Sequence, residues 1–163
     1  MRDRRLLIVA VALALVFAVT WLWRAAGDGV TDRVEVGAGA STTVDGVIYR
    51  LESLRTSDRV TSGAADQIVA TRGATLVLAT VTYDATAATT PVYCNFELVA
   101  GDANWDPEMG WTPPEGEAAF CDSGSTGSVS ALFEVPQGFL SRVQGVGITN
   151  PDGALPLLLG RPG

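Results

Sequence analysis

The sequence predicts an all-β fold, an antiparallel β-sandwich of about seven strands, preceded by one N-terminal transmembrane helix. The helix is indicated by an uncharged apolar run that begins at residue 6. The strands are indicated by apolar residues at alternate positions from residue 44 onward, with turn residues about every ten positions. No segment after the apolar run keeps the 3.6-residue period of a helix. The alternative is a mixed α+β domain with one short helix near residues 138–145.

The apolar run, LLIVAVALALVFAVTWLW, covers residues 6–23 and contains no charged residue. At about 1.5 Å per residue, a helix of this length spans roughly 27 Å, which is close to the hydrocarbon thickness of a bilayer. The run is longer than the apolar core of a typical cleaved signal. Its end at Trp21 and Trp23 suits a membrane interface better than a cleavage site. We therefore interpret it as an uncleaved signal anchor, with a cleaved signal and a buried soluble helix as alternatives.

Basic residues on the two sides of the run set the expected topology. Arg2, Arg4 and Arg5 precede it, and only Arg24 follows it directly. Because basic flanks remain in the cytoplasm, residues 1–5 are expected to be a cytoplasmic tail and the rest of the chain extracytoplasmic. The small and polar residues at 24–43 suggest a stalk, and 44–163 the sandwich domain. The short segment VEV at 34–36 could instead be an edge strand of the domain.

The expected strands alternate apolar and polar residues, and they are separated by polar or glycine-rich segments. Their ranges are 47–54, 74–86, 92–100, 128–136, 143–149 and 155–160. Alternation places three groups each on one face: Val77, Ala79, Val81 and Tyr83; Cys94, Phe96 and Leu98; Val129, Ala131, Phe133 and Val135. Asn-Pro-Asp-Gly at 150–153 suits a type I turn that joins the last two strands as a hairpin. The polar segment at 56–67 is interpreted as a loop.

Three segments, TRGATLVLATVTYDAT, FELVAGD and SGSTGSVSALFEVP, resemble a bacterial family of secreted or membrane-tethered immunoglobulin-like domains of unknown function. That family is similar in fold to the immunoprotective extracellular antigen of mycobacteria. The resemblance covers about residues 44–150, and Asp84 stands where the first strand of the family often ends in asparagine. It rests on packing positions: Gly73, Phe96, Leu98, Gly127, Phe133, Val135 and Pro136. The resemblance implies an immunoglobulin-like sandwich. It implies no catalytic residues.

The composition argues against most enzyme classes and against nucleic-acid binding. The chain has no histidine, and its eleven basic residues are all arginine. This removes the commonest general base and metal ligand, together with lysine-based covalent chemistry. From residue 28 onward, seven arginines against seventeen acids leave a net charge of −10. We therefore expect no enzyme activity, no cofactor, no catalytic residue and no nucleic-acid partner.

The segment from 93 to 122 contains both cysteines of the chain, Cys94 and Cys121. In an exported domain two cysteines usually form a disulfide, and that pairing is expected here. Free thiols and a cysteine-based metal site are the alternatives, although the metal site lacks two ligands.

Acidic residues within the same segment raise two further alternatives. Asp102, Asn104, Asp106 and Glu108 alternate as at the start of an EF-hand loop, but prolines stand where its glycine and final glutamate are required. A calcium site of another type, built from Asp102, Asp106 and Glu108, remains open. A carboxylate pair such as Glu115 and Glu117 could in principle serve a hydrolase.

The aromatic and sulfur-containing residues of the segment suggest a contact surface. Trp105, Met109 and Trp111 could bind a partner, or the tryptophans could fold back over the edge of the sandwich. The leading hypothesis is a non-enzymatic module of the bacterial cell envelope that is anchored in the membrane by its N-terminal helix. Its extracytoplasmic domain would bind a protein partner or act as an accessory subunit. The alternative is an extracytoplasmic sensor of calcium or of a small ligand.

Overall fold

The computed structural model of the chain describes residues 15–19, 33–63, 66–89, 94–113, 121–149 and 155–163. The chain divides into two compact units, Met1–Asp32 and Arg33–Gly163.

In the first unit, residues 15–19 are helical and their apolar side chains are largely exposed; Phe17, for example, is 70% exposed. The described residues include no helix with the length and apolar character that a membrane crossing requires. The other positions of the predicted anchor at 6–23 lie outside the described residues, as do the tail at 1–5 and the stalk positions 24–32.

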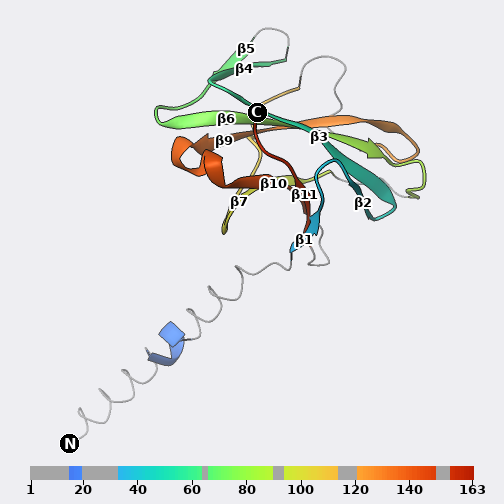
Figure 1. Ribbon diagram of the computed structural model, residues 1–163, viewed down its shortest axis with the longest axis horizontal. Coiled ribbons are helices and arrows are strands. Elements are labelled where there is room, and N and C mark those ends of the chain that lie inside the picture. Colours follow the sequence, from blue (N-terminus) through green and yellow to red (C-terminus); the bar gives the residue numbers. More distant parts are fainter. Residues whose placement is uncertain (1–14, 20–32, 64–65, 90–93, 114–120, 150–154) are drawn as a thin grey trace, which may run out of the picture. The chain divides into compact units, whose positions relative to one another are not determined.

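The second unit is predominantly β, as the sequence predicts (Figure 1). One sheet has the strand order β1 (Arg33–Val36), β11 (Leu155–Leu159), β10 (Val143–Ile148), β7 (Phe96–Ala100) and β8 (Ala103–Trp105). A second sheet has the order β2 (Ser41–Val44), β3 (Val47–Ser57), β6 (Ala74–Asp84) and β9 (Thr126–Pro136). Two short strands, β4 (Arg59–Ser62) and β5 (Asp66–Val69), form a separate ribbon. The 3₁₀ helix η1 (Gln137–Arg142) links β9 to β10.

Strands β6 and β9 form the longest pairing, antiparallel from Ala74↔Pro136 to Asp84↔Thr126. Each strand has eleven residues, so the period of two is repeated often enough to fix which side chains face the core. The inward groups predicted for both strands are confirmed, because all their members belong to one buried cluster. On β7, Phe96 and Leu98 are buried in that cluster, and Cys94 packs against it.

The core lies between the two sheets. Its larger cluster combines side chains of β3, β6 and β9 with side chains of β7, β10 and β11. Figure 1 shows β3, β6 and β9 in one layer and β7, β10 and β11 in the other. The rings of Tyr49 on β3 and Phe96 on β7 meet edge to face across the layers, with centroids 6.2 Å apart. Burial of these facing side chains is the main source of stability.

Residues 33–44 belong to the sheets, which corrects the stalk boundary expected at residue 43. Strand β1 pairs in parallel with β11, and Val36 packs against the core. The turn after β1 contains Gly39 with φ of 75°, a conformation that glycine adopts without strain, and β2 then joins the other sheet. Residues 33–44, whose polar composition suggested a flexible stalk, are therefore fixed by hydrogen bonds to both sheets.

Two further segments differ from expectation. The segment at 56–67, interpreted as a loop, contains the end of β3, all of β4 and the start of β5. These strands are short and mostly exposed, so they lack the apolar alternation that marks a strand in a sequence. The helix considered near 138–145 is present only as the 3₁₀ helix η1. Strands β10 and β11 pair antiparallel as predicted, while their connection at 150–154 lies outside the described residues.

Candidate functional site

The predicted disulfide joins Cys94 and Cys121, whose Cα atoms are 5.7 Å apart. Cys94 lies two residues before β7 in the five-stranded sheet, and Cys121 lies five residues before β9 in the four-stranded sheet. The bond therefore ties the two layers together at one side of the core. Cys121 is buried and Cys94 is half-buried, so one end of the bridge is sealed and the other borders a surface groove.

Tyr49 supports the bridge from the core. Its hydroxyl oxygen lies 3.4 Å from the Cys94 sulfur, and the residue is only 1% exposed. Burial raises the pKa of Tyr49 to about 12, and the negative charge of Asp45 adds to the rise. The phenol is therefore neutral at physiological pH and acts as a packing and hydrogen-bonding group.

A groove of about 560 Å³, here called the disulfide groove, lies beside the bridge. One wall is the outer edge of β9, the strand at the end of its sheet, and another is the start of β7. The segment at 106–113 completes it. The lining residues are Cys94, Asn95, Phe96, Glu97, Asp106, Pro107, Glu108, Met109, Trp111, Pro113, Val129, Ser130, Ala131, Leu132 and Thr149.

The segment at 106–113 is held at both ends of its turn. The backbone N–H of Glu108 donates to the carbonyl of Leu132 on β9 at 2.8 Å. The indole N–H of Trp111 donates to the carbonyl of Thr61 on β4 at 3.1 Å. Next to it, the backbone N–H of Thr112 donates to the hydroxyl of Ser62 at 3.0 Å. The β4–β5 ribbon thus serves as the support for this wall of the groove.

Of the three residues predicted to form a contact surface, the structure brings two to the groove. Met109 lines it and is fully exposed, and Trp111 lines it with its indole partly buried against β4. Trp105 lies elsewhere. Its ring packs edge to face on Phe139 of η1 with centroids 5.3 Å apart, because Trp105 is opposite the inward-facing Leu98 in the β7–β8 pairing.

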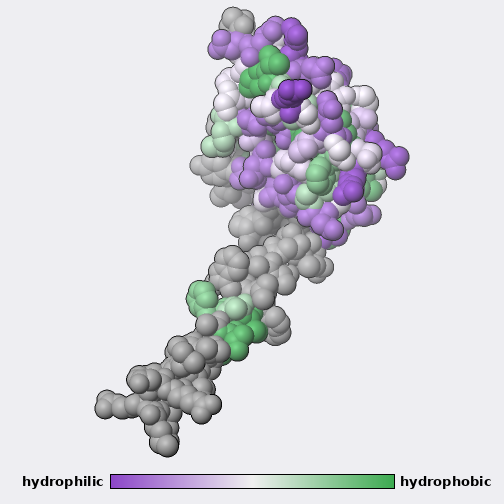
Figure 2. Space-filling view, turned by 90° about the vertical axis from the view of Figure 1, so that its left-hand side faces the viewer, coloured by the Kyte–Doolittle hydropathy of each residue, from purple (hydrophilic) through white to green (hydrophobic). Residues whose placement is uncertain are grey.

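The exposure of Met109 is unusual for this surface. Figure 2 shows a face of the second unit on which hydrophilic residues predominate and hydrophobic ones form small separate spots. Among the described residues of this unit, the other large exposed hydrophobic residues are 43–59% exposed: Val34, Ile48 and Val69. A flexible thioether held in solvent beside an apolar groove is typical of surfaces that contact other molecules.

The charged side chains described along the groove are all acidic: Glu97, Asp106 and Glu108. Glu97 accepts a hydrogen bond of 3.0 Å from the side-chain amide of Asn104. The described part of the chain holds no group of three or more Cys, Asp and Glu side chains that could bind a metal ion. Asp102, Asp106 and Glu108 are all described, so they do not form the calcium site considered above. Glu115 and Glu117 lie outside the described residues.

Sequence reasoning did not anticipate the groove residues on β7 and β9. Alternation identifies the inward face of Phe96 and Val129, but it does not say which strand ends a sheet. Ser130 and Leu132 lie on the opposite face from the core, and their importance depends on β9 being an edge strand. No local sequence signal gives that position.

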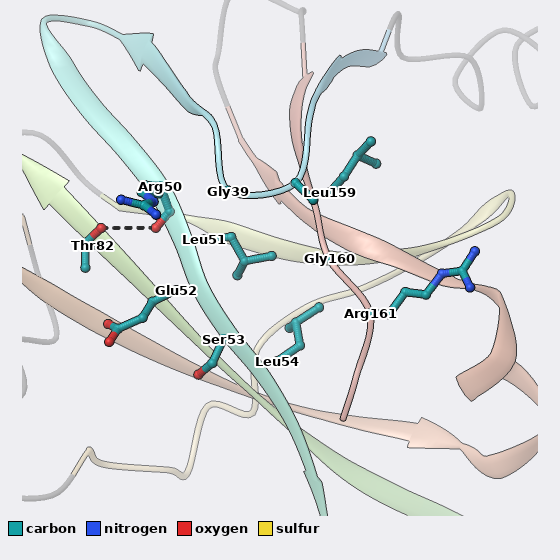
Figure 3. Close-up of a pocket in the computed structure, with 11 residues that line it drawn as sticks. Gly39, Arg50, Leu51, Glu52, Ser53, Leu54, Thr82, Leu159, Gly160 and Arg161 are labelled. Atoms are coloured by element: carbon teal, nitrogen blue, oxygen red, sulfur yellow. Dashed lines mark hydrogen bonds between the residues drawn. The ribbon is translucent and has the colours of Figure 1, made fainter.

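A second hollow, of about 520 Å³, lies beside β3 (Figure 3). Leu51 and Leu54 point toward it, while the side chains of Arg50 and Arg161 lie on different sides and point apart. Gly160 crosses so close to Leu51 that an added Cβ would overlap the leucine side chain. The charged groups do not converge on one point, so this hollow offers a weaker site than the disulfide groove.

No protein-family model, curated protein or solved structure matches the chain.

Proposed function

We propose that the protein is a non-enzymatic, membrane-anchored module of the bacterial cell envelope, whose extracytoplasmic β-sandwich binds a protein partner through the disulfide groove. The observation that carries the proposal is the fully exposed Met109 on a groove whose lining includes Phe96 and Cys94. Apolar surface of this kind gains free energy when a partner removes it from water. The surrounding carboxylates would set the charge of that partner.

The order of the strands supports an immunoglobulin-like reading of the sandwich. In that fold strands B and E are neighbours in one sheet, and strands C, F and G are neighbours in the other. Strands β6 and β9 have the first relationship, and β7, β10 and β11 have the second. The disulfide departs from the antibody pattern, because it joins the segments before β7 and β9 rather than strands B and F.

Three features support an anchored, extracytoplasmic position. Residues 6–23 carry no charge, and three arginines precede them. The described helical residues within this run, 15–19, have exposed apolar side chains, as expected of a segment solvated by lipid. A disulfide persists in oxidising compartments outside the cytoplasm.

The test is affinity purification of the tagged full-length chain from detergent-solubilised membranes, with two matched variants. Met109→Glu places a charge at the rim of the groove, and Val69→Glu places the same charge at an exposed apolar residue of β5. A partner should co-purify with the wild type and with Val69→Glu, and it should be lost with Met109→Glu. Equal recovery with both variants would contradict binding through the groove.

A further inference from the structure

The outer edge of β9 offers backbone hydrogen-bonding groups to the disulfide groove. Strand β9 ends its sheet, with β6 on its other side. The carbonyl of Leu132 accepts from Glu108 outside the sheet, so the backbone groups of Leu132 point away from β6. Because backbone groups in a strand point the same way at every second residue, those of Ser130 and Ser128 also point outward.

Ser130 makes this edge a site rather than an ordinary exposed strand. The residue is only 7% exposed and lines the groove. Its hydroxyl oxygen lies 3.3 Å from the hydroxyl oxygen of Thr80, the residue opposite it on β6. Such close side chains are expected where the backbone groups of two opposite residues do not hydrogen-bond to each other. Among the described residues, the backbone N–H and C=O of Ser130 make no hydrogen bond outside the β6–β9 pairing. Because they point away from β6, these groups can pair with a strand that adds to this edge.

The segment at 106–108 makes one backbone hydrogen bond with this edge, from the N–H of Glu108 to the carbonyl of Leu132. An incoming strand would continue that pairing along Ser130 and Ser128. Its alternate side chains would reach two different environments, the apolar floor at Phe96 and the carboxylates of Asp106 and Glu108. Positive side chains suit the second environment, because the described groove residues include acids and no base.

We infer that the partner of the groove is an extended peptide segment carrying lysine or arginine, which adds as a strand to the edge of β9 at Ser128–Ser130. This inference rests on the proposed function and specifies how the partner is recognised. In such strand addition, main-chain hydrogen bonds supply affinity and the pockets for alternate side chains supply specificity.

The probe is a phage-displayed library of random twelve-residue peptides, selected on the full-length chain. Selected peptides should be enriched in lysine and arginine. Each binder is then synthesised in two forms, N-methylated at odd or at even positions. One form should bind at least about tenfold more weakly, because it loses the N–H groups that face β9, while the other should bind unchanged. Hydrogen exchange should slow at the amides of Ser128 and Ser130 on binding.

The charge requirement is tested with isosteric variants. Glu97→Gln, Asp106→Asn and Glu108→Gln together should weaken binding roughly 3- to 150-fold, as expected for the loss of three exposed ion pairs. The control carries three neutralised acids away from the groove: Glu35→Gln, Glu52→Gln and Asp58→Asn. It should bind as the wild type does. Unchanged melting temperatures establish that both variants are folded.

The inference is overturned if the library gives no binder, if binders lack basic residues, or if both N-methylated forms bind equally. These outcomes are distinguishable from failure of the proposed function. A co-purifying protein that is lost with Met109→Glu, without strand-forming peptides, would mean that the partner docks through a folded surface.

Discussion

Removal of the disulfide is expected to lower the free energy of unfolding by about 3.6 kcal/mol. The figure follows from the sequence separation of 27 residues between Cys94 and Cys121, because the bridge restricts the unfolded chain. The double variant Cys94→Ala, Cys121→Ala keeps the pairings of β6 with β9 and of β7 with β10, so it should still fold. The double variant should therefore be less stable than the wild type but keep the same fold.

The assay is urea unfolding of the full-length chain, followed by tryptophan fluorescence. With a slope of about 2 kcal/mol/M, the midpoint should fall by roughly 1.8 M, and the melting temperature by about 10–15 °C. Reductant should bring the wild type to the stability of the double variant and leave the double variant unchanged. A loss below about 1 kcal/mol, or an equal effect of reductant on both proteins, would refute the chain-entropy argument.

Three further predictions concern the core. Gly145→Ala should lower the free energy of unfolding by about 1–3 kcal/mol or more, because the added Cβ would overlap the carbonyl of Leu158. The control Gly138→Ala has open space around it, so its stability in thermal unfolding should stay within about 0.5 kcal/mol of the wild type. Phe133→Ala should cost about 3–5 kcal/mol in urea unfolding, since Phe133 is fully buried. The folded Tyr49 should lose its proton near pH 12 and the unfolded one near pH 10, so the free energy of unfolding should fall as pH rises across this interval. Absorbance titration of wild type and Tyr49→Phe checks this, and a high-pH step that persists in the variant would contradict it.

The long central strands could be predicted from the sequence because burial alone specifies them. Strands β6 and β9 repeat the alternation over eleven residues, and the inward face of each matches the buried cluster. The short strands could not be predicted in this way. Strands β4 and β5 are mostly exposed, and they are held by hydrogen bonds to each other instead of by burial. The hairpin of β2 and β3 did have a usable signal, since Asp45-Gly46 at its turn has positive φ at both residues.

The candidate site could be predicted only in part. Cysteine count and the expected compartment were enough for the Cys94–Cys121 pairing. Met109 was considered as a contact residue because it stands between two tryptophans in the sequence. Trp105 was grouped with them by its proximity in sequence, although a two-residue turn sends it back over the core. The edge of β9 depends on the order of strands in a sheet, which is decided by contacts between residues far apart in the chain.

The central claim is that the disulfide groove contacts a protein outside the cytoplasm. The most direct measurement places a photo-activated phenylalanine analogue at Met109 in intact cells, and at Val69 as the control. We expect one discrete crosslinked protein from Met109 and none from Val69. Membrane-impermeant protease should remove the crosslinked band from spheroplasts. The same bands from both positions, no band from Met109, or a crosslinked product that the protease cannot reach would contradict it.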